Sequence, residues 1–344
     1  MEGKPLVLVT GVTGYVGSWV TLKLAEAKKY KIRATMRNPD NKEKVDLLEK
    51  AFGEHFSNIE LVKADLTDRD SIFKAVEGCT YVMHVASPFP LESPRNEDDV
   101  LVPAIEGTMN VLEASKEYGI KRVILTSSAV TINDGSRDGQ EIDETVWSED
   151  NDVINTYYKS KIRAEKAAWD FVNKLSEEEK FELVSLNPGG IFGPLLFKDD
   201  GTSQKFITDI INGNLPSIPN VCIQFVDVRD VADAHVKAID CKPFERYCIS
   251  EGTYMFPELA EILHNEYSQY GYGITYKAMW TSTIWVASWI LKDAAFFYAI
   301  WKSRVHVKND KSIKELGMKY IDAKTCFKDM FVSLAEHGYI RNLL

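Results

Sequence analysis

Two tyrosines and two lysines lie close together in the segment from Asn155 to Lys161, NTYYKSK. These residue types suit proton transfer, because a neighbouring ammonium favours the phenolate and lowers a phenol pKa that is ordinarily about 10. Tyr157 and Lys161 are one helical turn apart, the spacing that brings two side chains of a helix together. Ordinary amphipathic helices share this spacing, so the spacing alone does not identify a catalytic pair.

The residues from Thr156 to Leu175 have the periodicity of a helix. With Thr156 as its N-cap, this helix would place Tyr157 and Lys161 on a small, apolar stripe suited to packing against a sheet. Lys159 projects among polar positions and is expected to be solvated. Tyr158 lies about 100° from the stripe, which weakens its candidacy without excluding it.

A glycine-rich turn near the start of the chain follows a predicted strand and precedes a predicted helix, in the sequence LVLVTGVTGYVGSWV. Glycines at such a turn let the backbone approach a pyrophosphate, and the phosphates then meet the positive end of the helix dipole. This context predicts a dinucleotide site. The residues assigned to it are Gly11, Thr13, Gly14, Tyr15, Val16 and Gly17.

The end of the second predicted strand, IRATMRNPDNKEK, distinguishes between the two nicotinamide dinucleotides. An NAD site usually has an acidic residue here to bind the ribose 2′-hydroxyl. This sequence has Arg33 and Arg37 around the strand end and Lys44 at the next helix, and its first acidic residue, Asp40, lies in the turn. Basic residues at this place favour the 2′-phosphate of NADP.

The first half of the chain alternates β-rich runs with helical patterns, which predicts an α/β fold with a doubly wound, parallel Rossmann sheet. Residues 1–187 and 220–240 are assigned to an NADP-binding Rossmann domain. Residues 188–219 and 241–344 are assigned to a smaller, mostly C-terminal substrate-binding lobe. Ligands of such folds bind at the carboxyl edge of the sheet, where Asp65–Leu66 and His84–Ser87 follow two predicted strands.

Composition narrows the class of protein. The 344 residues carry a net charge of -10, which argues against a nucleic-acid partner. Five widely spaced cysteines and the absence of metal-ligand spacing indicate a reduced, cytoplasmic protein without a metal site. The apolar run Thr283–Leu291 is too short to span a bilayer. It is predicted to be a buried helix, with membrane-surface contact or a dimer face as alternatives.

Four motifs, TGVTGYVG, LTSSAVTIN, YYKSK and NPGGIFGP, occur in the order typical of the extended short-chain dehydrogenase/reductases. With IRATMRNP, HVASP and FVDVRDVADAHV, the chain resembles the dihydroflavonol-4-reductase-like branch of NADPH-dependent ketone and aldehyde reductases. Composition does not choose between Ser127 and Ser128. The resemblance implies a catalytic set of Ser128, Tyr157 and Lys161, in which Tyr157 delivers a proton to the developing alkoxide.

The same resemblance implies further contacts with cofactor and substrate. Besides the glycine turn, Tyr157 and Lys161, the implied cofactor contacts are Arg37, Lys44, Asp65, Leu66, Val85, Ala86, Ser87, Pro188 and Gly189. The implied substrate contacts are Ser87, Ser128, Asn133, Tyr157 and Phe225.

The chain departs from named subfamilies at several points. It lacks the NWYCY-type segment of cinnamoyl-CoA reductases, which argues against that activity, and its loops match no plant flavonoid enzyme closely enough to name a substrate. We therefore expect reduction of a small-molecule ketone or aldehyde by a monomer or homodimer. The alternatives are a sugar-nucleotide epimerase, a steroid dehydrogenase/isomerase, and a catalytically silent NADP sensor.

Overall fold

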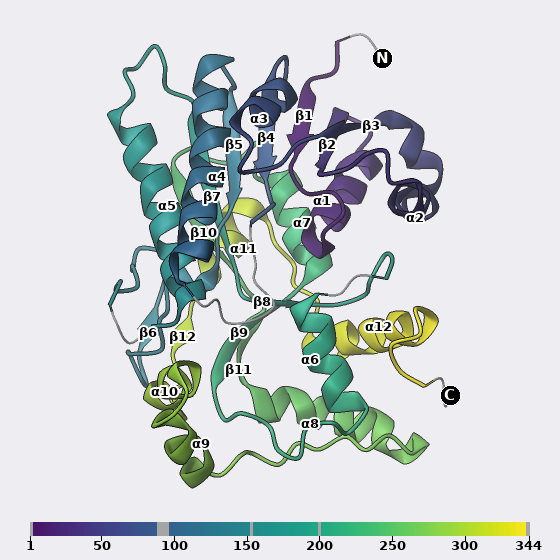
Figure 1. The fold of residues 1–344 in the computed structure, drawn as a ribbon, viewed down its shortest axis with the longest axis vertical. Helices are drawn as coiled ribbons and strands as arrows, with labels where there is room; N and C mark the ends of the chain where they lie inside the picture. Colours follow the sequence, from purple (N-terminus) through teal and green to yellow (C-terminus); the bar gives the residue numbers. More distant parts are fainter. Residues whose placement is uncertain (1–2, 88–95, 152–153, 199–200, 342–344) are drawn as a thin grey trace.

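A computed structural model describes residues 3–87, 96–151, 154–198 and 201–341. Within these ranges, seven parallel strands form a central sheet in the order β10-β7-β5-β4-β1-β2-β3 (Figure 1). The strands are β1 (Leu6–Val9), β2 (Lys31–Met36), β3 (Ile59–Lys63), β4 (Tyr81–His84), β5 (Arg122–Thr126), β7 (Glu182–Pro188) and β10 (Glu245–Ile249).

Helices cover both faces of this sheet, because successive residues of each strand point to opposite faces. Val7 and Val9 pack in one core, while Leu8 between them packs in another. The first core is covered by α1 (Tyr15–Glu26), α2 (Lys42–Phe52), α7 (Val228–Lys237) and α11 (Asp310–Leu316). The second is covered by α3 (Arg69–Val76), α4 (Asp98–Glu117) and α5 (Thr156–Lys174). The predicted doubly wound fold is confirmed.

The strand order reverses beside β1, which pairs with β2 on one side and with β4 on the other. The chain adds β2 and β3 outward and then returns to place β4 on the opposite side of β1. At such a reversal the connections after neighbouring strands diverge and leave a crevice at their carboxyl ends.

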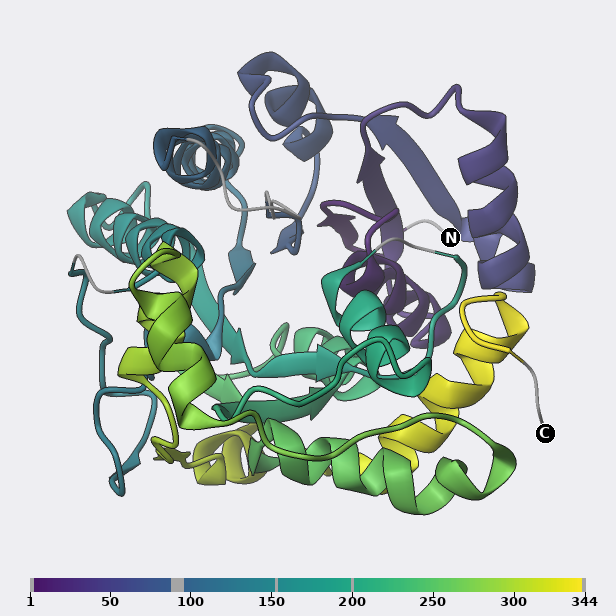
Figure 2. The ribbon, with the colours of Figure 1, turned by 60° about the horizontal axis from the view of Figure 1, so that its bottom comes forward.

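A smaller layer lies below this carboxyl edge and has its own core (Figure 2). Its sheet has the order β11-β9-β8, with β8 (Gly190–Phe192), β9 (Cys222–Asp227) and β11 (Gly252–Met255). Around it lie α6 (Thr202–Ile211), α8 (Phe256–Tyr267) and α12 (Ala323–Glu336). The remaining elements are β6 (Glu141–Ile142), β12 (His306–Val307), α9 (Thr281–Ser288), α10 (Lys292–Ala299) and the 3-10 turns η1 (Gly53–Asn58), η2 (Ala129–Thr131) and η3 (Ser268–Tyr270).

Two strands belong to a different sheet from the one that the predicted domain boundaries imply. Strand β10 was assigned to the lobe, but it pairs with β7 as an edge of the central sheet. Strand β9 was assigned to the Rossmann domain, but it pairs with β8 and β11 in the small sheet. Both are short β-rich runs, and a run of this kind does not reveal which sheet supplies its partner. The division into two functional domains stays a prediction.

The apolar run near Thr283 is not the buried helix that its composition predicts. Ile284 is buried, but Trp289 and Ile290 are 76% and 80% exposed. The run forms the short helix α9 and a turn. The following helix, α10, instead buries Phe296 against Ile154 and Ile162. Among the described residues, no helix is both long and apolar enough to cross a membrane.

His235 of α7 joins this helix to the sheet. Its Nδ1 lies 2.7 Å from the Val231 carbonyl oxygen, and its Nε2 lies 2.7 Å from Thr126 Oγ1. Because a carbonyl only accepts, Nδ1 carries the proton and Nε2 accepts from the threonine hydroxyl. Burial lowers the pKa of His235 to about 4, so the folded protein holds a neutral imidazole.

We expect acid to destabilise the protein through this histidine. The unfolded chain protonates His235 below about pH 6.5, whereas the folded protein resists protonation down to about pH 4. The unfolded state therefore binds more protons in this window, and the free energy of unfolding falls by up to about 1.4 kcal/mol per pH unit as pH decreases. Urea unfolding should show a shallower decline for His235→Gln than for wild type. Equal slopes would contradict the assignment.

Candidate functional site

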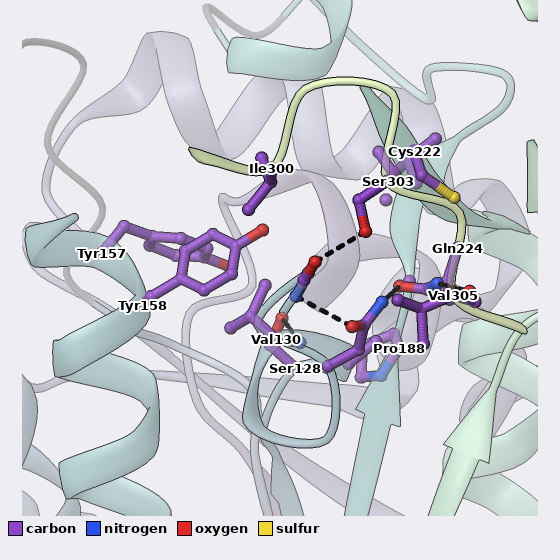
Figure 3. Close-up of a pocket in the computed structure, with 16 residues that line it drawn as sticks. Ser128, Val130, Tyr157, Tyr158, Pro188, Cys222, Gln224, Ile300, Ser303 and Val305 are labelled. Atoms are coloured by element: carbon purple, nitrogen blue, oxygen red, sulfur yellow. Dashed lines mark hydrogen bonds between the residues drawn. The ribbon is translucent and has the colours of Figure 1, made fainter. Parts of the chain in front are cut away.

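A cavity of about 200 Å³ opens where the central sheet meets the small sheet (Figure 3). Tyr157 and Tyr158 reach it from α5, and Cys222 and Gln224 reach it from β9 on the opposite side. Ile223 of β9 and Gly190 of β8 also line it. The other lining residues follow β5, end or follow β7, or lie after α10: Ser128, Ala129, Val130, Asn133, Gly135, Pro188, Gly189, Ile300, Ser303 and Val305.

Tyr157 and Ser128 meet in this cavity. Helix α5 begins one residue earlier than predicted, because Asn155 and not Thr156 caps it, accepting from the Tyr158 amide at 3.0 Å. Tyr157 therefore sits in the first turn, beside the end of β5. Burial raises its pKa, and a side-chain hydrogen bond with Ser128 partly opposes this effect. Burial thus outweighs the lowering expected from a neighbouring ammonium, and Tyr157 is a neutral phenol at neutral pH.

Lys161 lines a second, smaller cavity next to the first. Burial lowers the pKa of its ammonium to about 8, while the charge of Glu165 opposes this effect. His84 lines the same cavity, and burial together with the charge of Lys161 lowers its pKa to about 3. Lys161 is therefore the positively charged side chain at neutral pH among the described residues that line this cavity.

The side chains that α5 buries are not the ones predicted. Ile162, Glu165 and Val172 are buried on the Tyr158 side of the helix. The Tyr158 ring packs edge-on against the Phe296 ring of α10, with 4.8 Å between the ring centroids. The prediction that Lys159 is solvated is wrong. Its side chain is 8% exposed and its Nζ lies 3.2 Å from Glu97, next to the start of α4. Helical periodicity ranks faces by polarity, but it does not show that α4 and α10 cover two of them.

The glycine turn has the geometry of a phosphate-binding turn. Gly11 has φ +78°, and a Cβ at Gly17 would collide with the Gly11 carbonyl oxygen. Helix α1 begins after Gly14, and no described side chain caps its first turn. The amides and the positive end of this helix therefore face the crevice. Tyr15 points to the small sheet, where its hydroxyl donates to the Gly193 carbonyl at 2.7 Å.

Thr10 joins the glycine turn to the end of β4. Its Oγ1 accepts from the amides of Val85 and Ala86 at 3.0 Å each, and it lies 3.1 Å from His84 Nδ1. Since that hydroxyl has one hydrogen, it donates to Nδ1, and His84 is an acceptor there. His84 is thus a buried, neutral partner of Thr10.

The basic residues in and after β2 divide into two kinds. Arg37 and Lys44 are exposed near the carboxyl end of the strand. Arg33 instead binds Glu60 at 2.9 Å and the Ala75 carbonyl at 2.9 Å, so it holds β2 to its neighbours. Asp65 follows β3 and accepts from the Thr67 amide at 3.0 Å, which together with the Thr67 hydroxyl and Arg37 lowers its pKa. Leu66 lines the second cavity.

Pro188 and Gly189 lie where β7 ends, at the wall of the first cavity. The Gly189 amide donates to the Ile249 carbonyl at 3.0 Å. A Cβ at this glycine would collide with the Gln224 backbone, so the small residue lets β7 and β9 approach closely.

Two predicted substrate contacts are placed elsewhere. Phe225 is fully buried and stacks on Phe192 at 5.5 Å in the core of the small layer, away from the cavity. Ser87 lines the second cavity with Lys161. Asn133 does line the first cavity, where its Nδ2 donates to Gln224 Oε1 at 3.4 Å.

Sequence reasoning missed Gln224, Cys222, Ile300 and Ser303 as lining residues. Alternation along β9 was the available signal for Gln224, since a strand that buries Phe225 must turn its neighbour the other way. Ile300 and Ser303 carried no such signal, because they reach the cavity from a distant, irregular segment. Among the described residues, no cluster of possible metal ligands is found.

Comparison with known proteins gives consistent matches. The model of the NAD dependent epimerase/dehydratase family matches residues 7–249. Cinnamoyl-CoA reductase CAD2 of Medicago truncatula is 36% identical over 270 residues, 76% of this chain and 81% of that protein. An anthocyanidin reductase of Vitis vinifera is 34% identical over 78% of this chain and 82% of its own. The structure of yeast methylglyoxal/isovaleraldehyde reductase Gre2, solved with NADPH, has a TM-score of 0.80 and 26% identity. The match covers 97% of this chain and 100% of that chain.

The glycine turn permits a matched test. Gly17→Ala should lower the free energy of unfolding by about 1 to 3 kcal/mol, because its Cβ meets rigid backbone. Gly14→Ala should cost much less, since the nearest atom to its Cβ is at 3.5 Å, an ordinary contact. Thermal unfolding of the two variants without added nucleotide measures this difference. Similar losses in both would contradict the packing described for α1.

Proposed function

The chain belongs to the NAD dependent epimerase/dehydratase family, within the extended short-chain dehydrogenase/reductases, and we propose that it is an NADPH-dependent reductase converting a ketone or aldehyde to an alcohol. One observation carries the proposal. Tyr157 and Ser128 line the same cavity, and Lys161 follows Tyr157 by one turn of α5 and lines the second cavity. The relatives act on different substrates by name, so the proposal is limited to the carbonyl class.

The crevice fits a phosphorylated dinucleotide. Gly11 and Gly17 leave no room for side chains, and the first turn of α1 presents amides that no described side chain caps. Arg37 and Lys44 would hold a 2′-phosphate, and Val85, Ala86 and Ser87 would border the ribose and pyrophosphate. Pro188 and Gly189 would lie beside the nicotinamide. Bound NADPH would supply a hydride.

The chain's own residues would manage the substrate oxygen and the proton. Ser128 and Tyr157 donate hydrogen bonds to the carbonyl oxygen, which favours negative charge on that oxygen in the transition state. As the alkoxide forms, the Tyr157 O–H bond breaks and the proton moves to the substrate oxygen. The Lys161 ammonium favours the resulting phenolate. The raised pKa of Tyr157 supports the role of acid, which is the direction of reduction.

Substitution of the two adjacent tyrosines tests this role. Tyr157→Phe should lower turnover of NADPH with an aldehyde and ketone panel by at least about 100-fold, the usual contribution of a positioned acid. Its affinity for NADPH, measured by fluorescence titration, should remain. Tyr158→Phe should retain activity, because Tyr158 contributes ring packing against Phe296. Full activity of Tyr157→Phe would overturn the proposal.

Other outcomes of the same assay point to the other classes. NAD that co-purifies with the protein, together with no net oxidation of added NADPH, would indicate an epimerase. Tight NADPH binding without turnover of any carbonyl compound would indicate a cofactor sensor.

Cofactor preference can be tested at the end of β2. Arg37→Ala should raise the KM for NADPH by about 10-fold or more, since a charge-assisted contact with phosphate is lost, and should leave the KM for NADH nearly unchanged. Lys42→Ala removes an exposed cation at the start of α2 and serves as the control. Parallel losses with both cofactors would contradict a 2′-phosphate contact at Arg37.

We further propose a cytoplasmic location, with a monomer or homodimer as the working form. All five cysteines are free thiols, as expected in a reducing compartment.

A further inference from the structure

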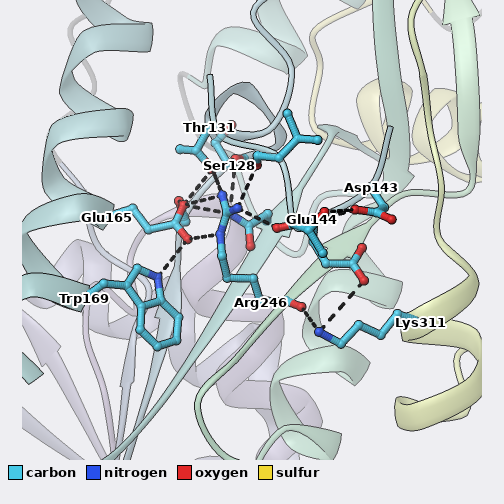
Figure 4. Close-up of polar contacts among 12 residues, drawn as sticks. Ser128, Thr131, Asp143, Glu144, Glu165, Trp169, Arg246 and Lys311 are labelled. Carbon is cyan, nitrogen blue, oxygen red and sulfur yellow. Dashed lines mark hydrogen bonds and ion pairs between the residues drawn. The ribbon is translucent and has the colours of Figure 1, made fainter. Parts of the chain in front are cut away.

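Glu165 lies at the middle of α5, one turn after Lys161, and only 1% of its surface is exposed. Each hydrogen-bond partner that the described structure gives it is a donor (Figure 4). Oε2 accepts from Ser127 Oγ at 2.5 Å, Thr131 Oγ1 at 2.6 Å and Asn187 Nδ2 at 2.8 Å. Oε1 accepts from Arg246 Nε at 2.8 Å and Trp169 Nε1 at 3.2 Å. This set of donors suits a charged carboxylate.

Arg246 Nη2 also donates to Oε2, at 3.4 Å. The other three donors on Oε2 come from segments that border the first cavity. Ser127 directly precedes Ser128, and Thr131 closes the turn η2 after it. Asn187 directly precedes Pro188 and Gly189 at the end of β7. One carboxylate of α5 thus fixes the ends of β5 and β7 relative to the helix that carries Tyr157 and Lys161.

Arg246 of β10 balances the charge of Glu165. Its Nη1 donates to the carbonyls of Glu144 and Val146 at 2.6 and 2.9 Å, and its guanidinium stacks on Trp147 at 3.7 Å. Burial raises the pKa of Glu165, but Arg246 and the two hydroxyls together hold it below its ordinary value. The carboxylate is therefore ionised at neutral pH.

The same carboxylate faces Lys161. The side chains with titratable groups that line the second cavity are Lys161 and Glu165 from α5 and His84 from β4, and His84 is neutral. Helix α4 contributes Ala104 and Thr108, which do not titrate. Tyr157, one turn before Lys161, is a neutral phenol. Arg246 lies behind Glu165, so loss of the carboxylate charge would leave Lys161 near an unbalanced cation.

We propose that Glu165 is a positioning residue of the reductase site: it holds Ser128 and Pro188–Gly189 in register with Tyr157, and it supplies the negative charge that keeps Lys161 an ammonium. This inference rests on the proposed function. The two parts of the role separate experimentally, because misplacement lowers kcat at every pH, whereas loss of the charge moves the pH at which Lys161 deprotonates.

The central variant is Glu165→Gln, which keeps the shape and removes the charge. Its kcat should fall by about 10-fold or more, because the ends of β5 and β7 lose their common acceptor. The alkaline limb of its kcat/KM profile should move to lower pH by about 1 unit, the effect of removing a neighbouring opposite charge. Asp170→Asn removes an exposed carboxylate from the same helix and should leave both quantities unchanged. Glu165→Asp keeps the charge and should hold the limb in place while kcat falls.

A wild-type kcat and an unmoved limb in Glu165→Gln would overturn the proposal. A uniform loss of kcat with an unmoved limb would overturn its electrostatic part and leave a purely structural residue. If Glu165→Gln does not fold, the double variant Glu165→Gln/Arg246→Met decides, because it leaves neither buried charge unpaired. We expect the double variant to lose kcat as Glu165→Gln does, with the alkaline limb of its kcat/KM profile closer to that of wild type. A wild-type kcat in the double variant would overturn the proposal.

The pKa of Lys161 also has a readout that needs no turnover. NMR titration of protein whose lysines are reductively methylated, with the Lys161 signal assigned by Lys161→Arg, should show the same shift to lower pH in Glu165→Gln. A wild-type protein that reduces no carbonyl compound would contradict the proposed function. An unchanged Lys161 titration would contradict only the role of Glu165.

Discussion

A parallel sheet places the carboxyl ends of all its strands along one edge, and the rest of this molecule depends on that constraint. The glycine turn after β1, the Val85–Ala86 segment after β4, Ser128 after β5 and Pro188 at the end of β7 are far apart in the chain. They are neighbours because each follows a strand of the same sheet. Thr10 shows how tightly two such ends are joined, since one hydroxyl accepts from two amides of the neighbouring strand end.

Burial has the largest influence on protonation at this edge. It raises the pKa of Tyr157 and lowers that of Lys161, so both groups move toward their neutral forms. Glu165 behaves differently because it is surrounded by donors and paired with Arg246, and these together outweigh its desolvation. A phenol that keeps its proton and an ammonium that is only moderately acidic are well matched for passing one proton to an oxygen. The protonation states of these α5 side chains therefore depend as much on partners from the strands as on the helix itself.

Much of the central sheet could be predicted from local pattern. The glycine turn carries its own context of strand and helix, and the βαβ rhythm leaves few topologies for the chain. The errors occurred where the partner of a segment decides its place. Lys159 is buried because Glu97 and α4 lie over it, and β10 joins the central sheet because β7 offers a free edge. The resemblance implies a substrate contact at Phe225, but an aromatic side chain on a strand is equally suited to the core, and Phe225 packs there.

The contacts of α1 have a consequence for any attempt to exchange parts between relatives. Tyr15 and Trp19 extend from the helix behind the glycine turn and donate to the carbonyls of Gly193 and Pro194 at 2.7 and 2.8 Å. The first loop of the small layer is thus fastened to the Rossmann side by side chains that a boundary near residue 188 would separate. A chimera that imports a foreign small layer must carry these two aromatic residues, or the backbone they bind, to keep its two parts in register.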